Sequence, residues 1–245
     1  MANRQRAEAR RKAQAKAAHQ PGGGGNSRGV MWIAIAVVVV VAAGIAIFAA
    51  SGDDAKSTAP VTSDSVSGSN LPDTQPVTVT GAALPAFDNA AAPDPAVGTL
   101  APVLAGKDFQ GDAVTIDGTK GGPYMVVFLA HWCPHCNREV PLLLDWKATG
   151  GVPASLHVVG VATAVSPSSA NYPPADWFSN KGWSWPVMVD QSQGEGVAGS
   201  AAQAFGASGW PYFVIVGADG KVKFRGSGEI TIDELQRVVD AAIAA

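Results

Sequence analysis

The sequence predicts an α/β fold over residues 95–245, with a central mixed sheet covered by helices on both faces. Two observations indicate this fold class. Short apolar runs rich in β-branched residues alternate with stretches of helical periodicity. Their order gives a strand–helix–strand half followed by a strand–strand–helix half, and each face of such a sheet needs a covering layer.

The first half contains the clearest elements. Residues 124–130 (YMVVFLA) form a short apolar run after a Gly-Gly-Pro sequence, which predicts a buried strand. Residues 134–147 predict a helix with its apolar residues on one face. Residues 156–162 predict a second buried strand.

The second half continues the alternation, and the Asp219-Gly220 dipeptide marks a tight hairpin turn. Together the elements make one domain of ordinary size. The remaining predicted elements are a short helix over 175–181, a strand over 186–190, a helix over 197–205, strands over 212–216 and 222–225, and an amphipathic helix over 232–244.

Charge and hydropathy divide the N-terminal part. Residues 1–29 carry seven Lys/Arg and one acid, and residues 30–50 form an uncharged apolar run, about as long as a bilayer-crossing helix. By the positive-inside rule, the sequence predicts a single-pass anchor in the cell membrane, with the N-terminus cytoplasmic and the C-terminal domain extracytoplasmic. A cleaved signal peptide is the alternative, although its apolar region would be unusually long.

Residues 51–94 are rich in Ser, Thr, Ala, Pro, Gly and Asp, with Phe87 as their aromatic residue. This composition buries too little apolar surface to offset chain entropy, so we predict a flexible linker, in which residues 77–80 have the composition of a short strand. From residue 51 onward, ten Lys/Arg stand against nineteen Asp/Glu. This acidic body argues against a nucleic-acid partner.

Both cysteines lie in the motif Cys133-Pro134-His135-Cys136, directly after the first predicted strand. A disulfide between them closes a ring of only four residues, which restrains the unfolded chain little. The pair is therefore a poor structural crosslink and fits a redox-active site. An inert disulfide remains an alternative.

The motif also fits a helix start. If Cys133 caps the predicted helix, Pro134 occupies the first position, where its missing N–H costs nothing. The sulfur of Cys133 then faces free N–H groups and the positive helix end, which favour the thiolate. His135 can add positive charge or a hydrogen bond. Cys136, one turn further along, is the candidate resolving thiol.

Residues 126–141 (VVFLAHWCPHCNREVP), including Trp132, resemble the active-site region of the thioredoxin superfamily. Residues 205–220 (FGASGWPYFVIVGADG) resemble its membrane-anchored TlpA/ResA-like branch. The resemblance implies a thioredoxin-like fold, with a cis proline at Pro211 that lies beside the cysteines and lines the substrate groove. We expect Trp132 and Trp210 at the surface of the same groove.

Three positions depart from that branch. The Pro-His dipeptide between the cysteines is similar to that of DsbA-type oxidases and favours the oxidising direction. Val127 stands where thioredoxin has a buried carboxylate, and Glu139 can replace that carboxylate only by pointing inward. Trp210 precedes the expected cis proline, where smaller residues are commoner.

The sequence therefore predicts a membrane-anchored thiol–disulfide oxidoreductase that exchanges disulfides with exported proteins. A membrane redox partner is expected to return its cysteine pair to the starting oxidation state. No organic cofactor or metal is implied. One alternative is a TlpA/ResA-like reductant of exported or apocytochrome cysteines. Another is a copper- or zinc-binding module that adds His131 or His135 to the cysteines. The candidate catalytic residues are Cys133, Cys136, His135 and Pro134, and the candidate substrate-binding residues are Trp132, Trp210 and Pro211.

Overall fold

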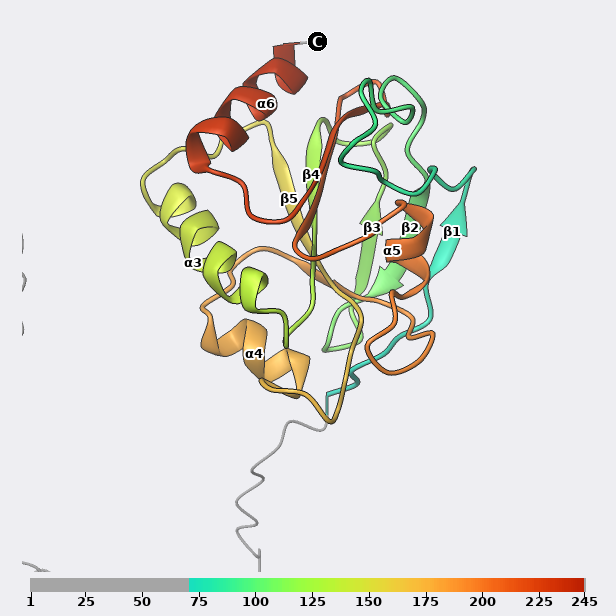
Figure 1. The fold of residues 1–245 in the computed structure, drawn as a ribbon, viewed down its shortest axis with the longest axis vertical. Helices are drawn as coiled ribbons and strands as arrows, with labels where there is room; N and C mark the ends of the chain where they lie inside the picture. The colour runs from blue at the N-terminus through green and yellow to red at the C-terminus, as the bar shows by residue number, and fades with distance from the viewer. Residues whose placement is uncertain (1–70, 245) are drawn as a thin grey trace, which may run out of the picture. The chain divides into compact units, whose positions relative to one another are not determined.

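The computed structural model describes residues 71–244 (Figure 1). The predicted cytoplasmic tail (1–29), the predicted membrane anchor (30–50) and the first part of the predicted linker (51–70) lie outside the described residues. Within 71–244, no helix has both the length and the apolar character that crossing a bilayer requires.

One eight-stranded sheet runs through residues 71–244, in the order β1-β2-β6-β5-β4-β7-β8, with β3 paired to β2. Its centre is parallel, because β4 pairs with β5 and β5 with β6, whereas β4–β7 and β7–β8 are antiparallel. The predicted mixed sheet is confirmed. The strands are β1 (Thr78–Thr80), β2 (Val103–Lys107), β3 (Ala113–Ile116), β4 (Tyr124–Leu129), β5 (His157–Ala162), β6 (Val187–Val189), β7 (Tyr212–Val216) and β8 (Val222–Ser227).

Helices cover both faces of the sheet, as the sequence predicts. The helices are α3 (Pro134–Ala148), α4 (Pro174–Asn180), α5 (Ser200–Ala204) and α6 (Ile232–Ala244). α3, α4 and α6 contribute buried side chains to one apolar cluster. α5 contributes to a second cluster on the opposite face, so that Figure 1 shows α3, α4 and α6 on one side of β4 and β5 and α5 on the other.

Strand β4 explains why one core forms on each face. All six of its residues are buried, and Met125, Val127 and Leu129 join one cluster while Val126 and Phe128 join the other. Side chains alternate across a strand, so a strand covered on both faces must be apolar throughout. The continuous apolar run in the sequence has this cause.

The sequence pattern does not reveal β2 and β3. In β2, a Cβ added at Gly106 would come within 3.1 Å of the Met188 sulfur, so close packing favours a glycine that weakens the strand signal. The helix predicted over 197–205 is shorter, because α5 begins only after its N-cap, Gly199. A Cβ at Gly199 would overlap the buried Asp190 carboxylate.

The structure corrects the second half of the predicted linker, which belongs to the domain. β1 adds a strand to the sheet, and the Leu84 N–H donates to the Ala204 carbonyl at 2.9 Å. Arg225 has a side chain with no exposed surface, and its Nε donates to Asp94 at 2.8 Å. The segment therefore covers the α5 face and supplies the carboxylate that pairs with a buried guanidinium.

Replacing Asp94 with alanine is expected to lower the free energy of unfolding by about 3 kcal/mol, because the buried Arg225 charge then lacks its partner. Urea titration followed by tryptophan fluorescence measures the change. Asp88→Ala is the control, since Asp88 is exposed and accepts a hydrogen bond from the Ala90 N–H; a loss below about 1 kcal/mol is expected. Equal losses in the two variants would contradict docking of this segment.

Candidate active site

The two cysteines lie at the junction between β4 and α3. Cys133 is the N-cap of α3, and its Sγ accepts a hydrogen bond from the Cys136 N–H at 3.3 Å. Pro134 occupies the start of the helix, where no N–H is needed. Both cysteines are free thiols in the structure. The motif therefore places a sulfur against the unpaired N–H groups at the positive end of a fifteen-residue helix.

A second segment reaches Cys133 from the C-terminal half of the domain. β7 lies beside β4, and the pairing of Phe128 with Tyr212 brings the residues before Tyr212 next to the end of β4. The Trp210–Pro211 peptide bond is cis. In its protonated form, Cys133 Sγ donates a hydrogen bond to the Trp210 carbonyl at 3.4 Å. Pro211 therefore lies beside the cysteine pair.

The two thiols differ in acidity. A hydrogen bond from the Cys136 thiol, and then the backbone N–H groups of Cys136 and His135, lower the pKa of Cys133 to about 6 against the opposing effect of burial. Burial raises the pKa of Cys136 far above its usual value, and the neighbouring Cys133 raises it further. Near neutral pH the reduced pair therefore holds a thiolate at Cys133 and a thiol at Cys136.

Alkylation of the reduced chain is expected to accelerate as pH rises through about 6, because only the thiolate reacts and the pKa of Cys133 is about 6. Below this midpoint Cys133 is protonated and the rate falls. Brief iodoacetamide pulses over a pH series, read by peptide mass spectrometry, measure the midpoint and identify the modified cysteine. A midpoint near that of an ordinary thiol, about 8.5, or preferential labelling of Cys136, would contradict the assignment.

His135 is exposed, and its ring contacts a residue from another element. Its Nδ1 lies 2.6 Å from Oε1 of Glu229, in the loop between β8 and α6. Within residues 71–244 the ring makes no hydrogen bond to Cys133. His135 favours the Cys133 thiolate through its backbone N–H, and its ring adds to this effect when it is protonated.

Trp132 and Trp210 flank the cysteines as half-buried side chains. Nε1 of Trp132 donates a hydrogen bond to the Ala164 carbonyl at 2.7 Å. Both rings pack against the apolar cluster under α3. The two tryptophans are therefore held by the core rather than fully exposed.

His131, two residues before Cys133, is buried and has both ring nitrogens engaged. Nε2 lies 3.2 Å from the Ser166 N–H, which can only donate, so Nδ1 carries the proton and donates to the Ala170 carbonyl at 2.8 Å. Burial lowers the pKa of this ring. His131 thus fastens residues 164–171 to the active-site loop, and neither ring nitrogen is free to bind a metal. No group of three or more His, Cys, Asp and Glu within 71–244 could hold a metal ion.

Glu139 lies one helical turn after Cys136 and points into the core. Its side chain is fully buried, and neither carboxylate oxygen has a hydrogen-bond partner among the described residues. Burial raises the pKa of this carboxyl to about 7. Val127 is part of the apolar core, and Glu139 provides instead a buried acid that can gain or lose a proton near neutral pH.

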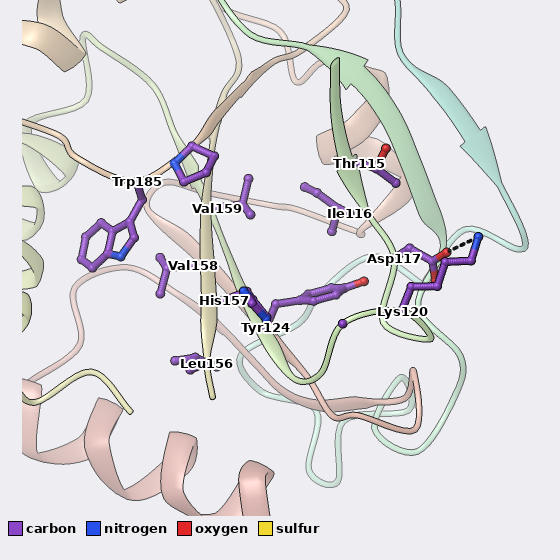
Figure 2. Close-up of a pocket in the computed structure, with 12 residues that line it drawn as sticks. Thr115, Ile116, Asp117, Lys120, Tyr124, Leu156, His157, Val158, Val159 and Trp185 are labelled. Atoms are coloured by element: carbon purple, nitrogen blue, oxygen red, sulfur yellow. Dashed lines mark ion pairs between the residues drawn. The ribbon is translucent and has the colours of Figure 1, made fainter. Parts of the chain in front are cut away.

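A separate cavity of about 540 Å³ lies at the other end of β4 and β5 (Figure 2). It is lined by Tyr124, Val158 and Val159, with the Asp117–Lys120 ion pair at one side. Tyr124 begins β4, whereas the cysteines follow its end, and five residues of strand separate the two ends by about 17 Å. This cavity is therefore no part of the cysteine site.

Comparison with known proteins gives one family model and several similar solved structures. The Redoxin family model matches residues 80–241. The chain is similar to a thiol:disulfide interchange protein from Chlorobium tepidum TLS, at 26% identity over 59% of this chain and 95% of that one, with a TM-score of 0.47. It is similar to DsbF from MTB (24% identity, 57% and 94% covered, TM-score 0.47) and to StoA from Bacillus subtilis (20%, 59% and 98%, 0.44). No curated protein gives a significant match.

The family match covers well over half of the chain and includes every element that builds the site. It spans the cysteine motif at the start of α3, the cis proline before β7 and the strands that hold them together. The chain therefore belongs to the Redoxin family and is a thiol–disulfide oxidoreductase of the thioredoxin superfamily.

Proposed function

We propose that this chain is a membrane-anchored, extracytoplasmic oxidoreductase that donates disulfides to exported proteins. The observation that carries the oxidising direction is the acidity of Cys133, whose pKa is lowered to about 6. A stabilised thiolate stabilises the reduced protein and so makes its disulfide a stronger oxidant. The Pro134-His135 dipeptide, similar to that of DsbA-type oxidases, supports the same direction.

The reaction consists of two thiol–disulfide exchanges. A substrate thiolate attacks Cys133 Sγ in the Cys133–Cys136 disulfide, which breaks the S–S bond and releases Cys136 as a thiolate that takes up a proton. A second substrate thiolate then attacks the substrate sulfur of the mixed disulfide and releases the Cys133 thiolate. The substrate loses two electrons and gains a disulfide, and the protein is left as a dithiol.

Each group beside the cysteines has a task in this scheme. The helix N-terminus favours Cys133 as the leaving thiolate. Glu139, with a pKa of about 7, supplies the proton to Cys136 on reduction and accepts it on reoxidation. The backbone around the Trp210–Pro211 bond borders Cys133 and offers a carbonyl to an extended substrate.

The membrane anchor rests on the sequence. The uncharged run over 30–50 comes directly after a basic tail, and this order favours export of the C-terminal domain. A disulfide donor in that location needs reoxidation, so a membrane quinone-linked partner is proposed. In cells that express the chain, treated first with a membrane-impermeant reductant that opens the Cys133–Cys136 disulfide, a membrane-impermeant maleimide should label Cys133 without lysis; labelling only after lysis would place the domain on the cytoplasmic side.

One observation favours the opposite direction. Glu229 lies beside His135, and its negative charge offsets the charge that favours the Cys133 thiolate. A TlpA/ResA-like reductant, supplied with electrons by a transmembrane donor, is therefore the second candidate.

Transfer assays with the full-length chain in mild detergent distinguish the two directions. The oxidised chain is mixed with a reduced, unfolded protein that has two thiols, and the reduced chain with the same protein in its disulfide form. The oxidase proposal predicts near-complete transfer in the first mixture and little in the second. The reverse result would establish the reductant.

A further inference from the structure

The loop between β8 and α6 sends one acidic side chain to the mouth of the active site. Oε1 of Glu229 lies 2.6 Å from His135 Nδ1, 2.6 Å from Arg138 Nη2 and 3.0 Å from Arg138 Nε. His135 belongs to the cysteine motif, and Arg138 lies one turn further along α3. A single carboxylate oxygen of Glu229 therefore contacts both the Arg138 guanidinium and the His135 ring, which is cationic when protonated.

The contacts indicate whether His135 Nδ1 donates or accepts a hydrogen bond. Arg138 Nη2 also lies 2.9 Å from His135 Nδ1. Nδ1 cannot both donate to Glu229 and accept from Arg138, and the shorter contact with an anionic acceptor favours the donating form. Glu229 therefore accepts from both His135 and Arg138, and these two hydrogen bonds lower the pKa of its carboxyl. The cluster is a carboxylate shared by two donors.

Both side chains act on the reactive sulfur. A protonated His135 ring favours the Cys133 thiolate. The hydrogen bond with Glu229 raises the pKa of Arg138, and the Cys133 thiolate raises it further. Among the described residues, the charges of this site also act on two buried groups. The Cys136 thiol is influenced by Cys133, and the Glu139 carboxyl by Glu229. Glu229 is thus the anion that counters the cations at the surface of the site.

We propose that Glu229 is a positioning residue that sets how strongly oxidising the Cys133–Cys136 pair is, by holding His135 and Arg138 and neutralising their charge beside Cys133. This inference deepens the proposed function and rests on it. Removing the negative charge leaves the two cations to favour the Cys133 thiolate, so the reduced form gains stability. The three side chains are exposed to solvent, with 58% of His135, 56% of Arg138 and 37% of Glu229 accessible, so salt should screen the effect.

The test compares Glu229→Gln with Glu234→Gln in the full-length chain. Both substitutions remove one negative charge, but among the described residues Glu234 makes no hydrogen bond or ion pair with His135 or Arg138. Each protein is equilibrated with glutathione buffers at low and high ionic strength, and its dithiol fraction is read by alkylation. Glu229→Gln should shift the equilibrium constant about threefold toward the dithiol at low salt, equivalent to about 14 mV at 29.6 mV per tenfold. The shift should shrink at high salt.

A double variant, compared with the triple variant that adds Glu229→Gln, tests whether the effect acts through His135 and Arg138. In a chain with His135→Ala and Arg138→Gln, adding Glu229→Gln should no longer move the equilibrium toward the dithiol. A Glu229→Gln shift that equals that of Glu234→Gln, points toward the disulfide, or persists unchanged at high salt would overturn the proposal.

A second readout separates this proposal from the proposed function. The pH midpoint of Cys133 alkylation in the reduced chain needs no redox turnover, and Glu229→Gln should move it to lower pH. If the unmodified chain does not equilibrate with glutathione, the proposed function fails, while this midpoint still decides the role of Glu229. An unchanged midpoint would overturn the inference even in a fully active enzyme.

Discussion

Replacing Cys133 with serine is expected to abolish disulfide exchange, with a loss of rate on the order of a thousandfold or more. Exchange requires a sulfur that forms a thiolate near neutral pH, and the pKa of Cys133 is lowered to about 6 for this purpose. A serine hydroxyl neither ionises in this range nor forms a bond to substrate sulfur that exchange can break. The measurement is the rate of disulfide transfer to a reduced two-thiol protein.

The Cys133→Ser variant should fold normally, because serine is a favoured N-cap and can accept the hydrogen bond from the Cys136 N–H. Its thermal unfolding midpoint, compared with that of the reduced unmodified chain, checks this point. A folded variant that keeps a tenth of the transfer rate would show that Cys133 is not the attacked sulfur.

The Cys136→Ala variant is expected to accumulate a mixed disulfide with its substrate. In this variant the Cys133 thiolate attacks a substrate disulfide, one substrate sulfur leaves as a thiolate, and no second thiol is present to release the rest. Cys136 is the buried thiol one turn from Cys133, so no other residue can replace it in a chain with two cysteines. Non-reducing electrophoresis followed by mass spectrometry detects the adduct.

The double variant Cys133→Ser/Cys136→Ala is the matched control and should trap nothing. Adduct formation in the double variant would mean that the trap is nonspecific. Absence of adduct in Cys136→Ala, with Cys133 still reactive toward iodoacetamide, would contradict the assignment of Cys136 as the resolving thiol.

The sequence predicts the centre of the fold well and its periphery poorly. β4 is apolar at every position because both of its faces are covered, and this gives an unambiguous local signal. β2 contains Gly106, which the Met188 side chain requires, and the segment over 84–94 owes its place to Arg225, more than 130 residues further along. Such long-range causes leave no local pattern.

The same contrast holds at the site. The motif itself indicates the N-cap position of Cys133 and the place of Pro134, because helix-start rules are local. The inward orientation of Glu139 depends on the packing of α3, and the Glu229 contact depends on where the loop after β8 lies. His131 is buried and hydrogen-bonded to two backbone groups that are distant in the sequence. Because these partners leave no local pattern, its position near the cysteines suggested a metal ligand instead.

Cys133 and Cys136 are expected to form a reversible, oxidising redox pair, and a glutathione titration of the full-length chain is the direct test of this expectation. The chain is equilibrated with buffers of graded redox poise, and the dithiol fraction is read by alkylation of its two cysteines. We expect a reversible two-electron curve with a midpoint nearer to about −120 mV than to about −270 mV. A dithiol fraction that does not respond to the buffer, or a midpoint at the reducing end, would contradict it.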